Sequence, residues 1–346
     1  MAVNIEKIFT ETLRLAIKNG ASDVHFSSGM PPVIRIVGQL RQVDIEPLES
    51  RELTRLFTGM LTDKQKEYFK KHNEIDLAIE LNGLSRFRVN FYQHMNGISG
   101  AFRIVNSRIR TMQELRLPVV MKSIIERRKG LILVTGPTGS GKSTTLASMI
   151  HEINISRPDH VITIEDPVEY VHKPHKSLIH QREVGVHADD FAAALRSALR
   201  EDPDVILVGE MRDTETISNA LRAAETGHLV LSTLHTNSAP DTVDRIINVF
   251  PAEQQQQVRQ LLASTLVAVI SQRLIPKATN DDRVAVMEIL VNTSAVKNLI
   301  REGKTHQLDS AIQTGVEHGM QTFDRSLMDL KLNNIVSPNV ELKNHV

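Results

Sequence analysis

Residues 131–143 read LILVTGPTGSGKS, and this stretch decides how the rest of the chain is interpreted. Its second part fits the pattern G-x-x-x-x-G-K-[ST], in which glycines let successive backbone N–H groups turn inward around a phosphate. The apolar run 131–135 predicts a buried strand, and residues 143–154 are compatible with a helix. This is the strand–loop–helix setting that such a loop requires. We therefore predict a site for a nucleoside triphosphate.

Two side chains at the end of this loop carry the chemistry of nucleotide binding. Lys142 supplies a positive charge for the β- and γ-phosphates of ATP, and the Ser143 hydroxyl can bind Mg²⁺. A glycine-rich turn without a ligand is the alternative, but composition alone produces the pattern in roughly one chain of this size in a hundred. The residues expected to bind ATP are Gly136, Pro137, Thr138, Gly139, Ser140, Gly141, Lys142, Ser143 and Thr144.

Short apolar runs alternate with helix-compatible segments on the C-terminal side of the loop. This alternation predicts an α/β fold with a parallel sheet and helices on both faces. We expect this domain to span 118–346, with a loose polar tail after 333. Further strands are expected at 161–164, 205–208, 229–233 and 284–290. Helices are expected at 254–269, 293–302, 306–313 and 320–332.

The residues before the loop predict a different kind of domain. Helical spacing of apolar residues at 4–18 and at 51–71 is combined with alternating, strand-like runs. Asn82-Gly83 between two such runs indicates a β-hairpin. We expect a small α+β domain over 1–105, followed by a polar, basic linker over 106–117.

Carboxylates end two of the expected strands. Glu165 and Asp166 follow one of them, and Glu210 follows another after Gly209. Ligands of open α/β sheets bind at the carboxyl ends of the strands, so these groups are expected to face the phosphate loop. We assign Glu210 to orienting the attacking water, Glu165 to supporting water or Mg²⁺, and Asp166 to the metal. Helix capping, or ion pairing with nearby arginines, is the alternative.

His235 closes a further strand-like run, LVLSTLHTN at 229–237, at the same expected edge. It is a candidate to sense the γ-phosphate or to relay between subunits. A single histidine at a strand end is usually structural, so the residues alone leave both interpretations open.

Composition excludes several classes of function. Among 346 residues, 41 Lys and Arg balance 41 Asp and Glu, which argues against a nucleic-acid partner held by bulk charge. The absence of cysteine excludes disulfides, thiolate metal sites and thiol catalysis. No apolar run approaches the roughly 20 residues that a membrane span needs, and the N-terminus has no signal-peptide core. We expect a cytoplasmic protein without direct membrane insertion.

With these motifs in place, the chain resembles the secretion-type ATPases, and most closely the PilT-type retraction motors of type IV pili. The resemblance covers nearly the whole chain. It rests on ASDVHF at 21–26, the Walker A motif at 136–144, IEDPVEY at 164–170 as the Asp box, LVGEMRD at 207–213 as the atypical Walker B motif, STLHTN at 232–237 as the His box, and AVKNLIRE at 295–302 as the C-terminal motif of the retraction group.

The resemblance implies a PAS-like N-terminal domain, a RecA-like ATPase domain and a homohexameric ring. It implies that ATP hydrolysis is converted into mechanical work for pilus retraction and twitching motility. The expected place is the cytoplasmic face of the inner membrane, on the platform protein of the pilus machine, with a paralogous ATPase as a further candidate partner. It also strengthens a catalytic assignment for His235 and extends it to His228.

Other members of the superfamily remain as alternatives. Pilus extension and type II secretion ATPases usually add a longer N-terminal region and a four-cysteine metal module, whereas this chain has no cysteine and about 130 residues before the loop. An accessory retraction paralogue and a nucleotide-gated regulatory subunit also stay open. A DNA-translocating motor is disfavoured by the zero net charge.

A ring motor gains rate if an arginine stabilises the charge of the transition state. Arg103 is the preferred candidate, because it ends a strand-like run just before the linker. The other candidates are Arg88 in the same domain and Arg200, Arg212 and Arg245 in a neighbouring ATPase core.

Overall fold

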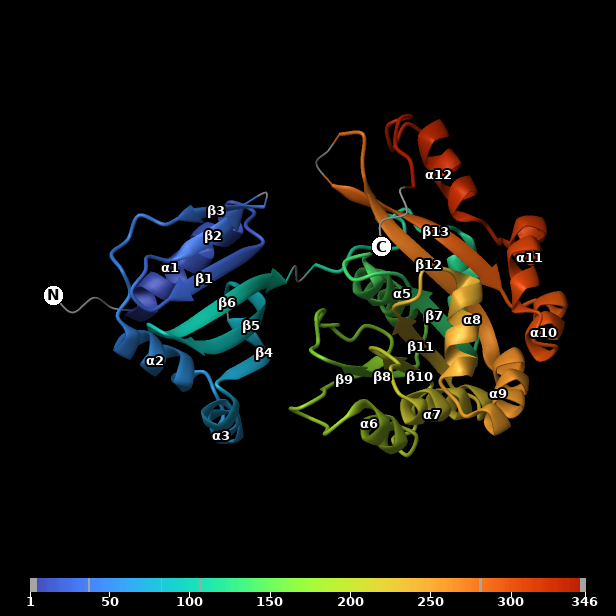
Figure 1. Ribbon diagram of the computed structural model, residues 1–346, viewed down its shortest axis with the longest axis horizontal. Helices are drawn as coiled ribbons and strands as arrows, with labels where there is room; N and C mark the ends of the chain where they lie inside the picture. The colour runs from blue at the N-terminus through green and yellow to red at the C-terminus, as the bar shows by residue number, and fades with distance from the viewer. Residues whose placement is uncertain (1–4, 37, 82, 106–107, 280–281, 343–346) are drawn as a thin grey trace. The chain divides into compact units, whose positions relative to one another are not determined.

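The computed structural model describes residues 5–36, 38–81, 83–105, 108–279 and 282–342. Contacts between Cα atoms divide the chain into two compact units, Met1–Arg108 (unit 1) and Ile109–Val346 (unit 2) (Figure 1).

The boundary between the units differs from the linker expected over 106–117. Residues 106 and 107 lie outside the described residues. The side chain of Met112 is only 6% exposed and lies in a core of unit 2, and Leu117 packs against the same core. Residues 109–117 are therefore part of unit 2, because a buried apolar side chain anchors them there.

Unit 1 is an antiparallel sheet with helices packed against it. Its elements are α1 (Ile5–Lys18), β1 (Asp23–Ser27), β2 (Val33–Ile36), β3 (Gln39–Gln42), α2 (Ser50–Gly59), α3 (Asp63–His72), β4 (Glu74–Leu81), β5 (Ser85–His94) and β6 (Gly97–Val105). The strand order is β3-β2-β1-β6-β5-β4. β4 and β5 form the expected hairpin, although Asn82 of its turn lies outside the described residues. The core contains a cluster of aromatic rings: Phe9, Phe26, Phe57, Phe87, Phe91 and Phe102.

The segment 51–71, expected as one helix, forms the two helices α2 and α3. The break is a capping box: the Thr62 hydroxyl accepts from the N–H of Gln65, and the Gln65 side chain accepts from the N–H of Thr62. Thr-x-x-Gln is a known helix-start signal. The helical spacing of apolar residues continues across this signal, so the spacing alone does not indicate that one helix ends and another begins.

Unit 2 is a mixed sheet between two layers of helices. Its strands are β7 (Gly130–Thr135), β8 (His160–Glu165), β9 (Leu178–Glu183), β10 (Val205–Val208), β11 (Leu229–Leu234), β12 (Leu266–Pro276) and β13 (Arg283–Val291). Its helices are α4 (Val120–Ile125), α5 (Lys142–Ser156), α6 (Phe191–Ala198), α7 (Thr214–Glu225), α8 (Ala239–Asn248), α9 (Ala252–Thr265), α10 (Ser294–Arg301), α11 (Leu308–Thr314) and α12 (Phe323–Leu332). The order is β13-β12-β7-β11-β10-β8-β9, in which only β13 is antiparallel to its neighbour.

Two strands of this sheet, β9 and β12, were not expected from the sequence. The helix expected to reach Val269 ends at Thr265, and β12 begins at the next residue. Leu266 and Val269 continue the apolar spacing of Val258 and Leu262, so helical periodicity does not mark the change. In the structure Leu266 and Val269 belong to β12, the strand between β7 and β13, and their side chains are buried.

The C-terminal helices α10, α11 and α12 lie close to their expected positions. The Thr293 hydroxyl caps α10 by accepting from the N–H of Val296. The tail after 333 was expected to be loose, but Val336 is 1% exposed and packs with Ile275 and Leu327. One buried valine thus ties the described part of the tail to unit 2.

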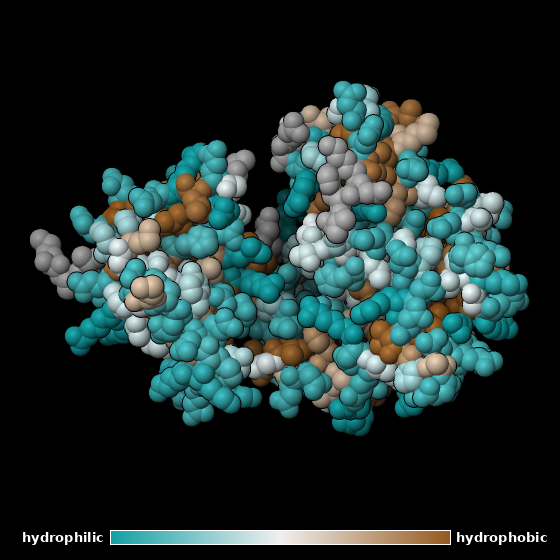
Figure 2. All heavy atoms as spheres, viewed as in Figure 1, coloured by the Kyte–Doolittle hydropathy of each residue, from teal (hydrophilic) through white to brown (hydrophobic). Residues whose placement is uncertain are grey.

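The face of the molecule in Figure 2 is mainly hydrophilic, with hydrophobic residues scattered between polar ones. Within the described ranges, no helix combines the length and the apolar character needed to cross a bilayer.

Met112→Ala will destabilise unit 2, because it removes a side chain from the core that α4, α5 and the sheet share. We expect the free energy of unfolding to fall by about 2–5 kcal/mol, measured by urea denaturation. The neighbouring exposed residue provides the control: Gln113→Ala should change the free energy by less than about 0.5 kcal/mol. Equal effects of both substitutions would contradict the assignment of 109–117 to unit 2.

Candidate active site

The phosphate loop, residues 136–141, joins the buried strand β7 to helix α5. Gly136 and Gly141 have φ angles of 142° and 88°, which L side chains rarely adopt. A Cβ on Gly136 would lie 2.3 Å from the carbonyl oxygen of Gln272 on β12. Glycine is therefore required where the loop leaves the sheet. The loop ends at the N-terminus of α5, where unpaired N–H groups and the helix dipole favour an anion.

Lys142 folds back over this loop. Its Nζ donates hydrogen bonds of 2.7 Å to the carbonyl of Gly136 and 3.1 Å to that of Pro137. Burial lowers the pKa of Lys142, and the nearby carboxylates of Glu210 and Glu169 oppose that shift. The ammonium group thus donates to two loop carbonyls, and phosphate oxygens can take the place of these carbonyls as its acceptors.

Gln272 fixes the loop from β12. Its Nε2 donates to the carbonyl of Ser140 over 2.6 Å, and its Oε1 accepts from the Thr145 hydroxyl over 2.9 Å. The side chain is 1% exposed, so these bonds form away from water. No local sequence pattern predicts a role for Gln272, which lies 132 positions from Ser140. The only signal of this role in the sequence is a glutamine within the largely apolar run of β12.

Glu165 ends β8 in a polar pocket. Its Oε1 accepts from the Thr163 hydroxyl over 2.7 Å and from the Gln181 amide over 3.2 Å. Burial raises the pKa of Glu165 to about 7, against the opposing effect of these two hydrogen bonds. The carboxyl group is therefore partly protonated near neutral pH. Asp166, the next residue, is exposed.

Glu210 follows β10 and meets two basic side chains. Its Oε1 lies 2.7 Å from Nε of Arg212, and its Oε2 lies 3.7 Å from Nε2 of His235. The three side chains line a hollow together with Thr236 and Arg245. Burial lowers the pKa of His235, and Lys142 lowers it further, whereas Glu210 raises it. The net shift favours a neutral imidazole beside the Glu210 carboxylate.

His228 is not brought to this group. It precedes β11, and its carbonyl accepts a hydrogen bond from the N–H of Gly130, the first residue of β7. It therefore lies at the amino ends of the strands, whereas the phosphate loop lies at their carboxyl ends. Its Nδ1 is 3.0 Å from the carbonyl of Ala223, at the end of α7. Within one chain, the structure therefore does not bring His228 to the phosphate loop.

Arg103 lies in unit 1, on β6. Its Nε donates over 3.0 Å to Oδ1 of Asp23, while 68% of its side chain is exposed. Asp23 also lies 4.0 Å from Arg35. Arg103 is therefore held in an ion pair with a carboxylate of its own unit.

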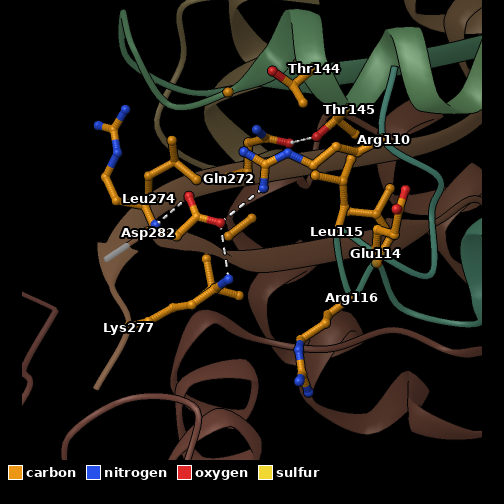
Figure 3. Close-up of a pocket in the computed structure, with 15 residues that line it drawn as sticks. Arg110, Glu114, Leu115, Arg116, Thr144, Thr145, Gln272, Leu274, Lys277 and Asp282 are labelled. Atoms are coloured by element: carbon orange, nitrogen blue, oxygen red, sulfur yellow. Dashed lines mark hydrogen bonds and ion pairs between the residues drawn. The ribbon is translucent and has the colours of Figure 1, made fainter. Parts of the chain in front are cut away.

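A pocket borders the phosphate loop on the side of α5 (Figure 3). Gly141, Thr144 and Thr145 line one wall, and the segment 110–117 lines another. Asp282 lies across from them, bonded to Lys277 over 3.0 Å and to Arg110 over 2.9 Å. Burial alone would raise the pKa of Asp282, but these bonds and one from the Arg283 N–H lower it to about 2. Three of the charged groups that line the pocket, Arg110, Lys277 and Asp282, are thus already paired with one another.

Ser143 and Thr144 occupy the first turn of α5. The Ser143 side chain is exposed, and the Thr144 hydroxyl lies 2.9 Å from the hydroxyl of Tyr170. Tyr170 belongs to the segment that follows Glu165, so this contact ties the Asp box segment to the phosphate loop.

Comparison with known proteins agrees with this geometry. The Type II/IV secretion system protein family matches residues 2–331. The "Type IV pilus retractation ATPase PilT" of Pseudomonas aeruginosa is 50% identical over 95% of both chains. The "Type IV pilus ATPase PilU" of the same organism is 39% identical over 93% of this chain and 84% of that one. The crystal structure of the pilus retraction motor PilT with bound ADP superimposes with a TM-score of 0.89 and 44% identity, covering 97% of this chain and 95% of the other.

Fold and site together define a P-loop ATPase with a RecA-like core and a small α+β, PAS-like domain before it. The chain belongs to the Type II/IV secretion system protein family. The expected fold class and the use of ATP are thereby confirmed.

Glu165→Gln will change the pH dependence of stability. The folded-state pKa of Glu165 is raised from 4.5 to about 7, so the folded chain holds this proton more tightly than the unfolded chain between those values. Its contribution to stability is present below the lower value and is lost as the pH rises through the higher one. The free energy of unfolding, wild type minus variant, should therefore fall by roughly 1–3 kcal/mol between about pH 5 and pH 8.

Urea denaturation at several pH values measures this difference. Glu253→Gln, an exposed glutamate on α9, is the matched control and should give a difference that does not change with pH. A flat difference for Glu165→Gln as well would contradict the raised pKa.

Proposed function

We propose that this chain is the ATPase motor that drives type IV pilus retraction, and with it twitching motility. The observation that carries the proposal is the high identity to Pseudomonas PilT along almost the full length of both chains. Identity to PilU is lower, which favours the retraction motor over an accessory paralogue. A regulatory subunit with little turnover is disfavoured, because Lys142, Glu165 and Glu210 are all present: the charges of Lys142 and Glu210 interact, and Glu165 ends the strand next to the one that Glu210 follows.

ATP binding follows from the loop and its two neighbours. The N–H groups of the phosphate loop and the Lys142 ammonium group hold the phosphates. Lys142 exchanges its bonds to the loop carbonyls for bonds to phosphate oxygens. The pocket between Thr144 and the segment 110–117 receives the nucleoside, because it opens beside the same loop. Gln272 keeps the loop in shape while this exchange occurs.

Mg²⁺ is the proposed cofactor. The exposed Ser143 hydroxyl and the exposed Asp166 carboxylate are oxygen donors of the kind that Mg²⁺ prefers. When bound, the ion neutralises charge on the β- and γ-phosphates.

Hydrolysis requires a group that orients the attacking water, and we assign this role to Glu210. Arg212 holds one of its oxygens, and the other faces His235. A neutral His235 can donate or accept a hydrogen bond at the γ-phosphate as charge develops there. Glu165, with its raised pKa, supports water from the end of β8, the strand next to the one that Glu210 follows. No catalytic role is proposed for His228.

Force generation requires that sites be coupled, and we propose a homohexameric ring for this reason. Arg103 of unit 1 remains the candidate that completes a site, because its side chain is mostly exposed and an ion pair such as the one with Asp23 is exchanged at little cost in free energy. The proposed place of work is the cytoplasmic face of the inner membrane, where the ring acts on the pilus platform protein. A paralogous ATPase is a further candidate partner.

Glu210→Gln keeps the shape of the side chain but removes the charge that polarises water. We expect kcat for ATP to fall about 100-fold or more, while the Kd for ATP stays within about threefold. Steady-state ATPase assays and nucleotide titration measure the two quantities. Lys142→Ala is the comparison, since it should weaken binding as well as turnover. Should Glu210→Gln remain active while Glu165→Gln is inactive, the two roles are exchanged.

The retraction proposal is tested in a strain that lacks this chain. We expect that strain to carry excess pili that do not retract, and the wild-type chain to restore retraction. A strain without pili would indicate an extension ATPase instead.

Asn298→Ala and Arg301→Ala should separate motor output from chemistry. Both residues are exposed on α10, where Nη2 of Arg301 donates to Oδ1 of Asn298 over 2.8 Å. We expect ATPase activity within about twofold of wild type but impaired retraction in the complemented strain. Ile300→Ala, at a fully buried position of the same helix, is the folding control and should lower both activities. Parallel losses in the surface variants would point to misfolding.

A further inference from the structure

A row of polar side chains crosses the sheet of unit 2 next to the phosphate loop. Thr135 on β7 pairs with Ser271 on β12, and Ser271 pairs with Glu288 on β13. The hydroxyls of Thr135 and Ser271 lie 2.9 Å apart, and all three side chains are buried. Because Thr135 immediately precedes Gly136, this row begins at the base of the phosphate loop.

Glu288 ends the row at the first residue of α8. Its Oε1 accepts a hydrogen bond of 2.8 Å from the N–H of Ala239. N–H groups of the first helical turn have no partner within the helix. Pro240 has no N–H, and the N–H of Asp241 donates to the Ser238 hydroxyl over 3.2 Å. Glu288 thus supplies the acceptor that fixes the start of this helix.

The start of α8 is also the end of the loop 235–238, which carries His235. The Thr236 hydroxyl lies 2.6 Å from that of Thr242 on α8, and Thr242 also donates to the carbonyl of Ser238 over 2.6 Å. The loop is therefore bonded to the first turn of α8 at two places. A shift of that turn is transmitted to His235, which faces Glu210.

We propose that Glu288 is a positioning residue for ATP hydrolysis: by holding the N–H of Ala239, it fixes the loop that sets His235 against Glu210. The proposal rests on the function proposed above for those two residues. Glu288 acts through the backbone of α8 and not through contact with ATP.

Packing alone does not account for a carboxylate at this position. An apolar residue of similar volume avoids the cost of burying a charged group. Burial raises the pKa of Glu288, the bond from Ala239 lowers it, and Asp309 on α11 and Asp241 raise it. The cost of burying this carboxylate is offset by the hydrogen-bond acceptor that it supplies to the N–H of Ala239.

Glu288 also adjoins the C-terminal helices. It lines a cavity with Arg273, Asp309 of α11 and Phe323 of α12. The guanidinium carbon of Arg273 lies 4.8 Å from the centre of the Phe323 ring. The position of α11 and α12 therefore sets the charges around Glu288, which connects those helices to the catalytic loop.

The test compares three variants of the full-length protein in steady-state ATPase assays. Glu288→Ala should lower kcat about 10- to 100-fold while the KM for ATP stays within about twofold, because the phosphate loop is untouched. Glu288→Gln retains an oxygen that accepts from Ala239 and should restore kcat to within about threefold of wild type. Ser326→Ala is the matched control: Ser326 is equally buried, at 8% exposure, and accepts from the N–H of Met287, but on α12. It should leave kcat within about twofold.

Three outcomes overturn the proposal: wild-type kcat in Glu288→Ala, equal loss in Glu288→Gln, or equal loss in Ser326→Ala. The double variant His235→Ala/Glu288→Ala should be no slower than His235→Ala alone, because both changes act on one loop. Additive losses contradict the route through His235. Wild-type activity in His235→Ala refutes the proposed role of that histidine, whereas a slow His235→Ala with an active Glu288→Ala refutes only the positioning role.

Discussion

Backbone hydrogen bonding between parallel strands is the constraint on which the site depends. The register pairs Thr135 of β7 with Leu234 of β11 and with Ser271 of β12. It also pairs Val208 of β10 with Ile164 of β8. The residues that follow Thr135, Leu234 and Val208 therefore leave the sheet at the same edge, where Glu165 ends β8. Segments that are far apart in the chain supply one site because their strands end together.

The same register separates residues that the sequence motifs had grouped. His235 and His228 flank one strand, and the resemblance to the family implied a catalytic role for both. β11 places them at opposite ends, so only His235 can meet Glu210 in the same chain. A motif in a parallel strand therefore has to be interpreted together with the direction of that strand.

Local patterns predicted the parts of the site that are local in the chain. The phosphate loop, its strand and its helix were expected at the correct residues, because glycine spacing and apolar runs are properties of neighbouring residues. Gln272 was not predicted, because its role arises from pairing between β12 and β7. The first residues of that strand continue the helical spacing of α9, and the expected helix extended into them as far as Val269.

The linker shows the same limit at the level of domains. Its polar, basic composition suggested a free connection, yet the buried side chain of Met112, with Leu117 packed against the same core, places part of it in unit 2. One buried side chain outweighs several polar neighbours, because only the buried one loses contact with water. The composition of a segment is an average over its residues, so it does not show which single side chain fixes a domain boundary.

The two sides of the phosphate loop differ in how firmly they are built. On the β12 side, Thr135, Ser271 and Gln272 are buried and hydrogen-bonded, so their loss would leave polar groups without water. On the other side, Glu210 meets Arg212 and His235 through side chains that are 73% and 47% exposed. Exposed side chains can replace such contacts with water at little cost in free energy. We therefore expect a change at the γ-phosphate to alter the contact between Glu210 and His235. The buried hydrogen bonds on the β12 side hold the phosphate loop in place meanwhile.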